Sequence, residues 1–380
     1  MPDSPLRIAH TESSTGWGGQ EIRILSEAAG FIARGHDVVV YATPGSRIVA
    51  EATRFGVPAV ALPIGVKRTR GVLAMLGALR ARPVDIVNTH SSTDTWLAAL
   101  ACRYLRLRGG DSPAIVRTRH VSVPVAANRA TRWLYGHATT RIVTTGEALR
   151  QALIRDLGID AARVFSVPTG IDPQRHAGLD KAAARASARL PRDLPLVGIV
   201  ATLRSWKGHR HLIDALSRMR HVDARLVIVG DGPQRAALQR QVADAGIDAR
   251  VLFAGQQDDV APWLAALDVF ALPSYANEGV PQALLQAMFA GVPCVTTDAG
   301  AIGEIAHAGT TALVVPRENP EALAAAIDSL LDDDALGQRL AGNARELVAG
   351  RHTQSVMLDR MHAVFRNALA DPRHARRNAR

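Results

Sequence analysis

The chain has 380 residues, 47% apolar and 21% charged, a composition typical of globular proteins and a length that favours two hydrophobic cores over one. It has only two cysteines, Cys102 and Cys294, so we expect no disulfide framework and a protein of the reducing cytoplasm. Because it has no apolar run long enough to span a bilayer and no leader-like N-terminus, we expect no membrane span. The net charge of +10 is concentrated in residues 1–175, where 22 Lys and Arg stand against 13 Asp and Glu, which indicates either an anionic partner for this half or simple solubility.

Short runs rich in Val, Ile and Ala alternate with helical patterns along the chain. The runs are apolar on both faces, which is typical of parallel strands covered by helices on both sides. We expect strands at residues 6–10, 37–41, 86–89, 114–119, 141–144 and 164–167 in the first half, and at 196–201, 225–230, 251–254, 269–272, 294–296 and 312–315 in the second. The fold class is therefore α/β, with two doubly wound domains.

A cluster of Pro, Gly and Asp at residues 168–173 interrupts the pattern and predicts a domain boundary. We expect an N-terminal domain at residues 1–173 and a C-terminal domain at 174–352. The remaining residues, 353–380, are expected to form a helix that returns to the N-terminal domain and a basic, solvated tail.

A glycine-rich turn, GWGGQE at residues 16–21, follows the first strand. Gly18 and Gly19 would let the backbone approach an anionic ligand closely, at the positive end of the next helix. The spacing is not that of the dinucleotide-binding fingerprint, and an ordinary turn is the alternative.

Two similar features occur in the second half. The loop LRSWKGH, at residues 203–209, offers Lys207 and Arg204, which suit a diphosphate. Gly230 and Gly255 end the next two strands, where a nucleoside could approach the backbone. A solvated loop and plain turns are the alternatives.

The strand at 269–272 leads into PSYANEGVP, at residues 273–281, and then into a helix that extends to about residue 290. Pro281 suits the first turn of that helix, whose free N–H groups would bind phosphate. Glu278 would accept hydrogen bonds from sugar hydroxyls. Gln282 and Gln286 share one face of the helix, four residues apart.

These motifs together resemble the retaining GT-B glycosyltransferases of family 4, also called group 1, many of which make lipopolysaccharide and cell-surface polysaccharide. The resemblance spans nearly the whole chain: the motifs GWGGQE, RTRH, PTGID, LRSWKG, GDGP and EGVP occur in the family's order. It implies a GT-B fold, two Rossmann-like domains facing a central cleft, with closure about a hinge near residues 170–172.

The resemblance also implies residue roles. Gly18 and Gly19 would lie in the loop over the donor diphosphate, and His120 would contact the reacting sugar. Lys207 would hold the phosphates, Glu278 the donor sugar, and Gly279, Val280 and Pro281 would form the turn that presents backbone donors to it.

Two positions depart from the family pattern. The second acid of the E-x7-E motif, which binds the donor ribose, is replaced by Gln286, a substitution that weakens the expected contact by about 1 kcal/mol. The usual phosphate-binding arginine is replaced by Thr202, and Arg204 is the candidate to supply its charge.

The expected reaction is transfer of a sugar from a UDP- or GDP-sugar to a hydroxyl of a glycan or glycolipid, with retention, without a metal or other cofactor and without an assigned nucleophile. An epimerase or phosphorylase of the same fold and a non-catalytic nucleotide-sugar-binding protein are the alternatives. Nucleic-acid binding is disfavoured, because the basic residues lack interleaved aromatics.

The acceptor is expected on the basic first half. Lys67, Arg68 and Arg70, together with the segment that contains Arg129 and Trp133, suit an anionic lipid at the inner face of the membrane. A solvated surface with Trp133 in the core is the alternative.

Overall fold

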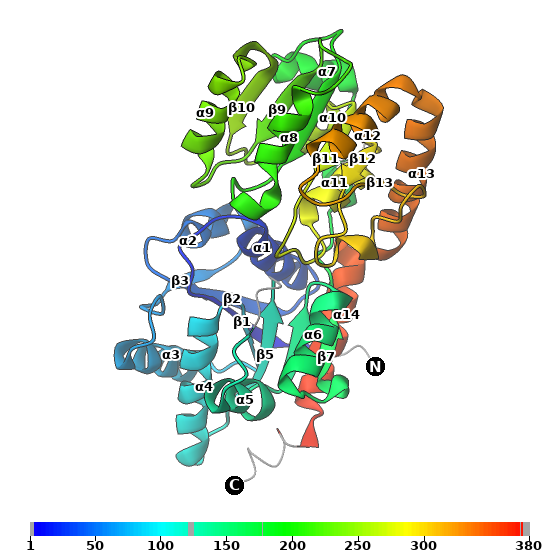
Figure 1. Ribbon diagram of the computed structural model, residues 1–380. Coiled ribbons are helices and arrows are strands. Elements are labelled where there is room, and N and C mark those ends of the chain that lie inside the picture. Colours follow the sequence, from blue (N-terminus) through cyan, green and yellow to red (C-terminus); the bar gives the residue numbers. More distant parts are fainter. Residues whose placement is uncertain (1–3, 121–124, 177, 373, 375–380) are drawn as a thin grey trace. The chain divides into compact units, whose positions relative to one another are not determined.

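A computed structural model describes residues 4–120, 125–176, 178–372 and 374 (Figure 1). The chain divides into two compact units: unit 1 comprises residues 1–168 and 354–380, and unit 2 comprises residues 169–353. Most of the basic tail predicted at the C-terminal end, namely residues 373 and 375–380, lies outside the described residues.

Unit 1 is built on a seven-stranded parallel sheet with strand order β3-β2-β1-β4-β5-β6-β7. Its strands are β1 (Arg7–Glu12), β2 (Asp37–Ala42), β3 (Ala59–Ala61), β4 (Ile86–Thr89), β5 (Ala114–Arg119), β6 (Arg141–Thr144) and β7 (Val164–Ser166). Its helices are α1 (Gly19–Ala33), α2 (Arg47–Glu51), α3 (Thr69–Ala81), α4 (Ser92–Leu107), α5 (Arg129–Trp133), α6 (Glu147–Leu157) and α14 (Gln354–Leu369).

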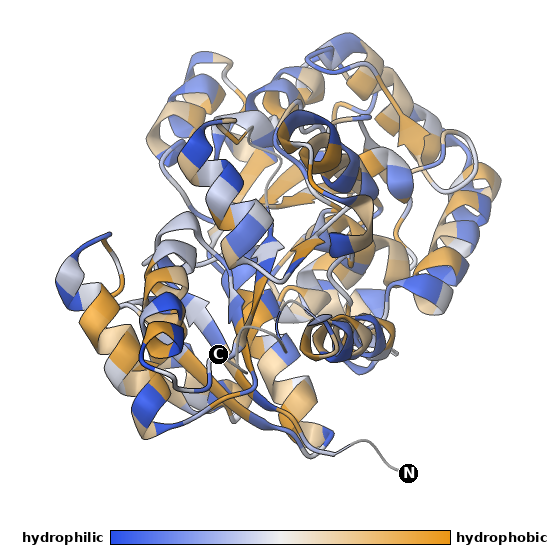
Figure 2. Ribbon diagram, turned by 90° about the horizontal axis from the view of Figure 1, so that it is seen from below, coloured by the Kyte–Doolittle hydropathy of each residue, from blue (hydrophilic) through white to orange (hydrophobic). Residues whose placement is uncertain are grey.

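Alternating side chains of this sheet divide the core of unit 1 into two layers. On β2, Val39 and Tyr41 belong to the layer covered by α3, α4 and α6. Val38 and Val40, which point the other way, belong to the layer covered by α1, α2 and α14. In Figure 2 the strands are coloured mainly as hydrophobic residues, whereas the helices carry bands of both hydrophobic and hydrophilic residues.

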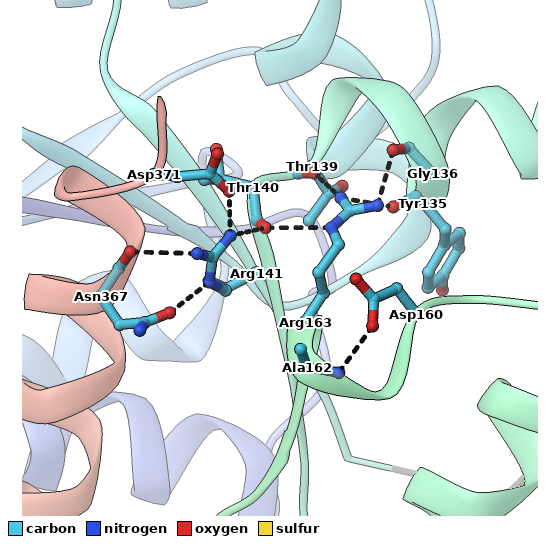
Figure 3. Close-up of polar contacts among 10 residues, drawn as sticks. All are labelled: Tyr135, Gly136, Thr139, Thr140, Arg141, Asp160, Ala162, Arg163, Asn367 and Asp371. Atoms are coloured by element: carbon cyan, nitrogen blue, oxygen red, sulfur yellow. Dashed lines mark hydrogen bonds and ion pairs between the residues drawn. The ribbon is translucent and has the colours of Figure 1, made fainter. Parts of the chain in front are cut away.

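Helix α14 belongs to unit 1 although it is the last element of the chain. Met361 and Phe365 are fully buried, and the Phe365 ring lies 5.4 Å from that of Phe31 on α1. At the far end of the helix, the Arg141 guanidinium on β6 donates hydrogen bonds to Asn367 and Asp371 (Figure 3). Apolar burial and a buried ion pair therefore fix the middle and the far end of α14 to unit 1.

Unit 2 has a six-stranded parallel sheet with strand order β10-β9-β8-β11-β12-β13. Its strands are β8 (Leu196–Val200), β9 (Arg225–Val229), β10 (Val251–Gly255), β11 (Val269–Leu272), β12 (Cys294–Thr296) and β13 (Leu313–Val314). Its helices are α7 (Lys181–Ser187), α8 (His209–Leu216), α9 (Arg235–Asp244), α10 (Ala261–Ala265), α11 (Gln282–Phe289), α12 (Pro320–Asp332) and α13 (Asp334–Arg351).

The beginning and the end of unit 2 are joined by backbone hydrogen bonding. Ile171 pairs with Thr353 in a parallel bridge, and its backbone N–H donates to the carbonyl of His352 at 2.9 Å. The α/β prediction is confirmed: each unit is a doubly wound parallel sheet. One strand was missed, the three-residue edge strand β3, which has no fully buried residue and is too short to give an apolar pattern.

Candidate active site

The candidate residues of unit 2 gather where the strand order of its sheet reverses. The order changes direction between β8 and β11, and ligands of open α/β sheets bind outside the carboxyl ends of strands at such a point. Lys207 ends the short 3₁₀ helix η5 (Ser205–Lys207) that follows β8. Glu278 lies in the loop that follows β11. Residues 71 positions apart are thus brought to one place.

Lys207 and Glu278 form a two-pronged ion pair. The Lys207 ammonium donates to both oxygens of Glu278, at 2.7 and 2.9 Å, and the Ser274 hydroxyl donates to Oε1 at 2.6 Å. The Glu278 side chain is 5% exposed and that of Lys207 is 21% exposed. Of about four acceptor positions on the carboxylate, bonds from the described residues occupy three and leave one on Oε2. The result is a buried, fixed acceptor beside a more accessible cation.

Two glycines allow the loops around this pair to approach each other. Gly208 has a φ of +77°, and a Cβ there would lie 2.0 Å from the carbonyl oxygen of Pro273. Gly300 has a φ of +59°, and its Cβ would lie 2.1 Å from the carbonyl oxygen of Glu278. No side chain fits either position, so the pair depends on both glycines. Asn277 adds backbone strain, with a φ of +59° next to Glu278.

The turn before α11 differs in one detail from the prediction. Helix α11 begins at Gln282, and Pro281 is its N-cap with an extended ψ of 124°, so Pro281 precedes the first turn instead of lying in it. Gly279, Val280 and Pro281 are buried. Gln286 is half-buried one turn into the helix, on the face that also carries Gln282.

The other candidates of unit 2 lie in the loop after β8 and at the ends of β9 and β10. Arg204 is exposed, and its guanidinium lies 5.8 Å from the centre of the Trp206 ring. Trp206 in turn accepts, through its carbonyl, a hydrogen bond from the Tyr275 N–H, which links the β8 and β11 loops. The Gly230 N–H donates to the carbonyl of Gly255 at 2.8 Å, so these two glycines lie together at the ends of β9 and β10.

In unit 1 the strand order reverses between β1 and β4, and the glycine-rich loop lies there, after β1. Gly18 is the N-cap of α1 and Gly19 its first residue. The loop is held by the buried Glu12 carboxylate, which accepts from Ser14 N–H at 2.7 Å and from the Gln20 side chain. Because local side-chain charge is negative, an anion here would depend on backbone N–H groups and the positive end of α1.

A second carboxylate beside this loop has an unusual pKa. Burial, followed by repulsion from Glu12, raises the pKa of Glu21 to about 7. The side chain is therefore partly protonated near neutrality, which lessens the negative charge at the loop. Glu21 is the last residue of the motif GWGGQE, whereas Glu12 lies outside that motif and was not predicted to lie at this loop.

His120 follows β5 and is half-buried. Its Nε2 lies 2.9 Å from Nδ1 of His90, and Nε2 of His90 lies 3.0 Å from Nδ1 of His10. His10 and His90 were missed by sequence reasoning. The only signal for them is that each stands at or just after the carboxyl end of a predicted strand.

The basic first half presents cations beside apolar and aromatic side chains. The Trp96 and Trp133 rings stack 5.5 Å apart, and the Lys67 ammonium lies 5.9 Å from the centre of Trp96. A cavity of about 260 Å³ is lined by Lys67, Arg68, Thr69, Val72, Trp96, Leu97 and Leu100. Trp133 is half-buried and not in the interior of the core.

Comparison with known proteins decides the family. Residues 17–175 match the profile described as Glycosyltransferase Family 4, and residues 194–333 match the one described as Glycosyl transferases group 1. The chain belongs to the family 4, group 1 glycosyltransferases. One relative of this glycosyltransferase is the lipopolysaccharide core biosynthesis glycosyltransferase LpsE of Rhizobium meliloti, 32% identical over 230 residues. That match covers 60% of this chain and 65% of LpsE, slightly less than two thirds of the relative's length.

Solved structures share the fold of this glycosyltransferase. A glycosyltransferase from Rickettsia africae has a TM-score of 0.85 at 18% identity, over 97% of this chain and 100% of the other. Anabaena HepE, solved in complex with UDP-glucose, has a TM-score of 0.84 at 21% identity, over 95% of this chain and 100% of the other. The predicted GT-B fold is therefore confirmed: two Rossmann-like units with parallel sheets of seven and six strands.

Proposed function

We propose that this glycosyltransferase moves a sugar from a nucleoside diphosphate to a hydroxyl of a glycan or glycolipid, with retention of the anomeric configuration. The observation that carries the proposal is the Lys207–Glu278 pair at the point where the strand order of unit 2 reverses. A cation for the diphosphate and a fixed carboxylate for sugar hydroxyls are what a sugar nucleotide requires. The complex of HepE with UDP-glucose supports this donor class.

The leaving diphosphate gains negative charge as its bond to the sugar breaks. Lys207, Arg204 and the free N–H groups at the start of α11 would stabilise that charge by preorganised electrostatics. Gly279 and Val280, in the turn that ends at Pro281, would present their backbone N–H groups as donors. We propose that no metal takes part, so the rate of transfer should be the same with and without a chelator.

Unit 1 would supply His120, as a contact to the sugar, and the Gly18–Gly19 loop. Gln286 would bind the ribose through its amide, and Gly230 and Gly255 would adjoin the nucleoside. Arg204→Ala tests the replacement of the usual arginine: a tenfold loss of donor affinity is expected, whereas unchanged affinity would leave the phosphates to Lys207 alone.

The test of the proposal is acceptor-dependent release of nucleotide from a panel of UDP-, GDP- and ADP-sugars, supplied with glycan and glycolipid acceptors. We expect one donor to be consumed only with acceptor present, and the product to keep the donor's anomeric configuration by NMR. Consumption without acceptor would indicate an epimerase or hydrolase, and consumption that requires orthophosphate would indicate a phosphorylase. Binding without turnover would indicate a silent nucleotide-sugar-binding protein.

We further propose that the acceptor is presented at an anionic membrane surface, which contacts α3 and α4. Apolar side chains are exposed on or next to these helices: Val66 (54% exposed), Leu73 (66%) and Leu107 (74%). Basic residues lie among them, namely Lys67, Arg68, Arg70 and Arg108. Apolar insertion and attraction to anionic headgroups would act together at such a surface. In the part of the chain that is described, no helix is long and apolar enough to cross a membrane.

Co-sedimentation with liposomes tests this contact. We expect binding to vesicles that contain phosphatidylglycerol, weaker binding to neutral vesicles, and loss of binding in Leu73→Asp. Val222→Asp, which changes a side chain 67% exposed on unit 2, is the matched control. Equal binding to neutral and anionic vesicles, or equal loss in both variants, would contradict the membrane proposal.

A further inference from the structure

Three histidines form a continuous hydrogen-bonded chain across the sheet of unit 1. His10 lies on β1, His90 directly follows β4 and His120 directly follows β5, and these three strands are neighbours in the sheet. The His10–His90 nitrogens are 3.0 Å apart and the His90–His120 nitrogens 2.9 Å apart. The ring centres of the two pairs are 5.3 and 5.2 Å apart, so each pair of bonded nitrogens lies close to the line that joins the ring centres.

The chain runs from the interior to the surface. His10 is fully buried, His90 is 2% exposed and His120 is half-buried. Burial, followed by the charge of Arg23, lowers the pKa of His10 to about 3. Burial and the neighbouring positive charges likewise lower the pKa of both other histidines well below the usual value. At neutral pH all three rings are therefore uncharged.

An uncharged imidazole has one N–H donor and one acceptor nitrogen. In a chain of such rings, the position of one proton determines the position of all the others. Two arrangements exist: either His120 Nε2 donates toward His90, or His120 Nε2 accepts and its N–H is on Nδ1. The choice is settled at the buried end of the chain.

At that end, Nε2 of His10 is buried and has no hydrogen-bond partner within the described residues. A buried N–H without a partner is rare in proteins, and a buried acceptor without one is somewhat less rare. Nε2 of His10 is therefore the lone-pair nitrogen, and Nδ1 of His10 donates to His90. His90 then donates from Nδ1 to Nε2 of His120, which leaves the proton of His120 on Nδ1.

We propose that His90 and His10 are positioning residues that hold His120 in the Nδ1–H tautomer, so that it offers a hydrogen-bond donor to an oxygen of the bound sugar. The free imidazole in water favours the other tautomer, so the chain reverses an intrinsic preference. The role assigned to the donor rests on the proposed function; the tautomer itself does not.

The tautomer is measured by ¹⁵N NMR of the full chain labelled at the histidine ring nitrogens, where protonated and unprotonated nitrogens have well-separated shifts. The His120 signals are assigned with His120→Asn, and the exposed His137 serves as the reference in the same spectrum. We expect an Nδ1–H ring for His120 and an Nε2–H ring for His137. An Nε2–H ring for His120 in the unchanged protein would overturn the proposal.

Two substitutions at His90 distinguish the effect of its hydrogen bond to His120 from the effect of its packing. In His90→Leu the donor to His120 is lost, and His120 should revert to Nε2–H. In His90→Asn the side-chain amide can still donate from nearly the place of Nδ1, so His120 should keep Nδ1–H. If both variants keep Nδ1–H, His90 does not set the tautomer. Should His90→Leu fail to fold, His90→Asn and the unchanged protein still test the arrangement.

Kinetics then test the role in the reaction. His90→Leu should lower kcat/KM for the sugar nucleotide about tenfold while leaving the affinity for the nucleoside diphosphate unchanged, and His90→Asn should restore most of the loss. Loss of affinity for both ligands alike would mean that His90 is only structural. If the unchanged protein binds no sugar nucleotide, the proposed function fails, whereas the NMR result still decides the tautomer.

Discussion

Glu278 is positioned by backbone contacts as much as by its ion pair. Its carbonyl lies against Gly300 and accepts the N–H of Ala301 at 3.2 Å, so the loop after β12 supports the loop after β11. Glu278 is thus fixed at both ends: its backbone by this contact, and its carboxylate by Ser274 and Lys207. A fixed acceptor loses little entropy on binding, which is the advantage of a preorganised site.

Gly300→Ala should therefore damage the site and not only the fold. The new Cβ meets the Glu278 backbone, so we expect a loss of more than 2 kcal/mol in stability and at least tenfold weaker binding of the sugar nucleotide. Gly309→Ala is the control, since Gly309 has a similar φ of +68° but open space around it. It should cost about 1 kcal/mol and leave binding unchanged. Comparable effects of the two substitutions on binding would refute the steric account.

At the scale of elements, α14 shows how the end of the chain completes unit 1. Its buried face supplies Met357, Met361 and Phe365 to the layer that also contains α1, while Arg141 holds its end. Removing one large buried side chain from such a layer leaves a cavity.

Phe365→Ala should accordingly lower the free energy of unfolding by about 3–5 kcal/mol. Arg360→Ala, on the exposed face of the same helix, should change it by less than about 0.5 kcal/mol. Chemical denaturation of the two variants beside the unchanged protein makes the comparison. A small effect of Phe365→Ala would mean that α14 is not docked as described.

The elements were largely predictable, and the exceptions have physical causes. Strands with continuous apolar runs, such as β2 and β9, can be recognised in the sequence because both of their faces are buried. The short strand β3 has no such run and could not be recognised. The position of Pro281 outside α11 depends on a backbone angle that the sequence does not display.

The site was predictable only in part. Lys207 and Glu278 were predicted from the loops that follow two strands and then from the resemblance to the family, and the structure brings them into contact. The histidine chain was not found, because its members are separated by 80 and 30 residues and meet only through the order of the strands. Glu12 was missed for the same reason: its bond to Ser91 joins the ends of β1 and β4.

For the whole molecule, buried histidines link stability to pH. Burial, followed by the charge of Lys207, lowers the pKa of His209 to about 3. Between pH 6.5 and 3 the unfolded chain takes up a proton at this position and the folded protein does not. The stability contributed at His209 is therefore lost as pH falls, at up to about 1.4 kcal/mol per pH unit.

His209→Leu removes this linkage and also removes a buried ring with neither nitrogen bonded within the described residues. We expect the difference in Tm, variant minus unchanged protein, to grow steadily as the pH is lowered from 7 to 4. His137→Leu, which changes an exposed ring, is the control for the removal of an imidazole. A Tm difference for His209→Leu that does not change with pH would mean that burial does not shift the pKa of His209.

The central claim is that Lys207 binds the diphosphate of a sugar nucleotide and Glu278 binds its sugar, and calorimetry tests this claim directly. Titrations would compare the nucleoside diphosphate with its sugar conjugate in the unchanged protein and in three variants: Lys207→Ala, Glu278→Gln and Lys181→Ala. Lys181, which pairs with Asp268 on the same unit, is the matched control and should have no effect.

We predict that Lys207→Ala weakens both ligands at least tenfold, because a charge-assisted bond to phosphate contributes about 1.5–3 kcal/mol. Glu278→Gln should weaken only the sugar conjugate and leave the diphosphate unchanged or tighter, since Lys207 is then released from its ion pair. Equal weakening of both ligands by Glu278→Gln, or unchanged binding in Lys207→Ala, would contradict the account.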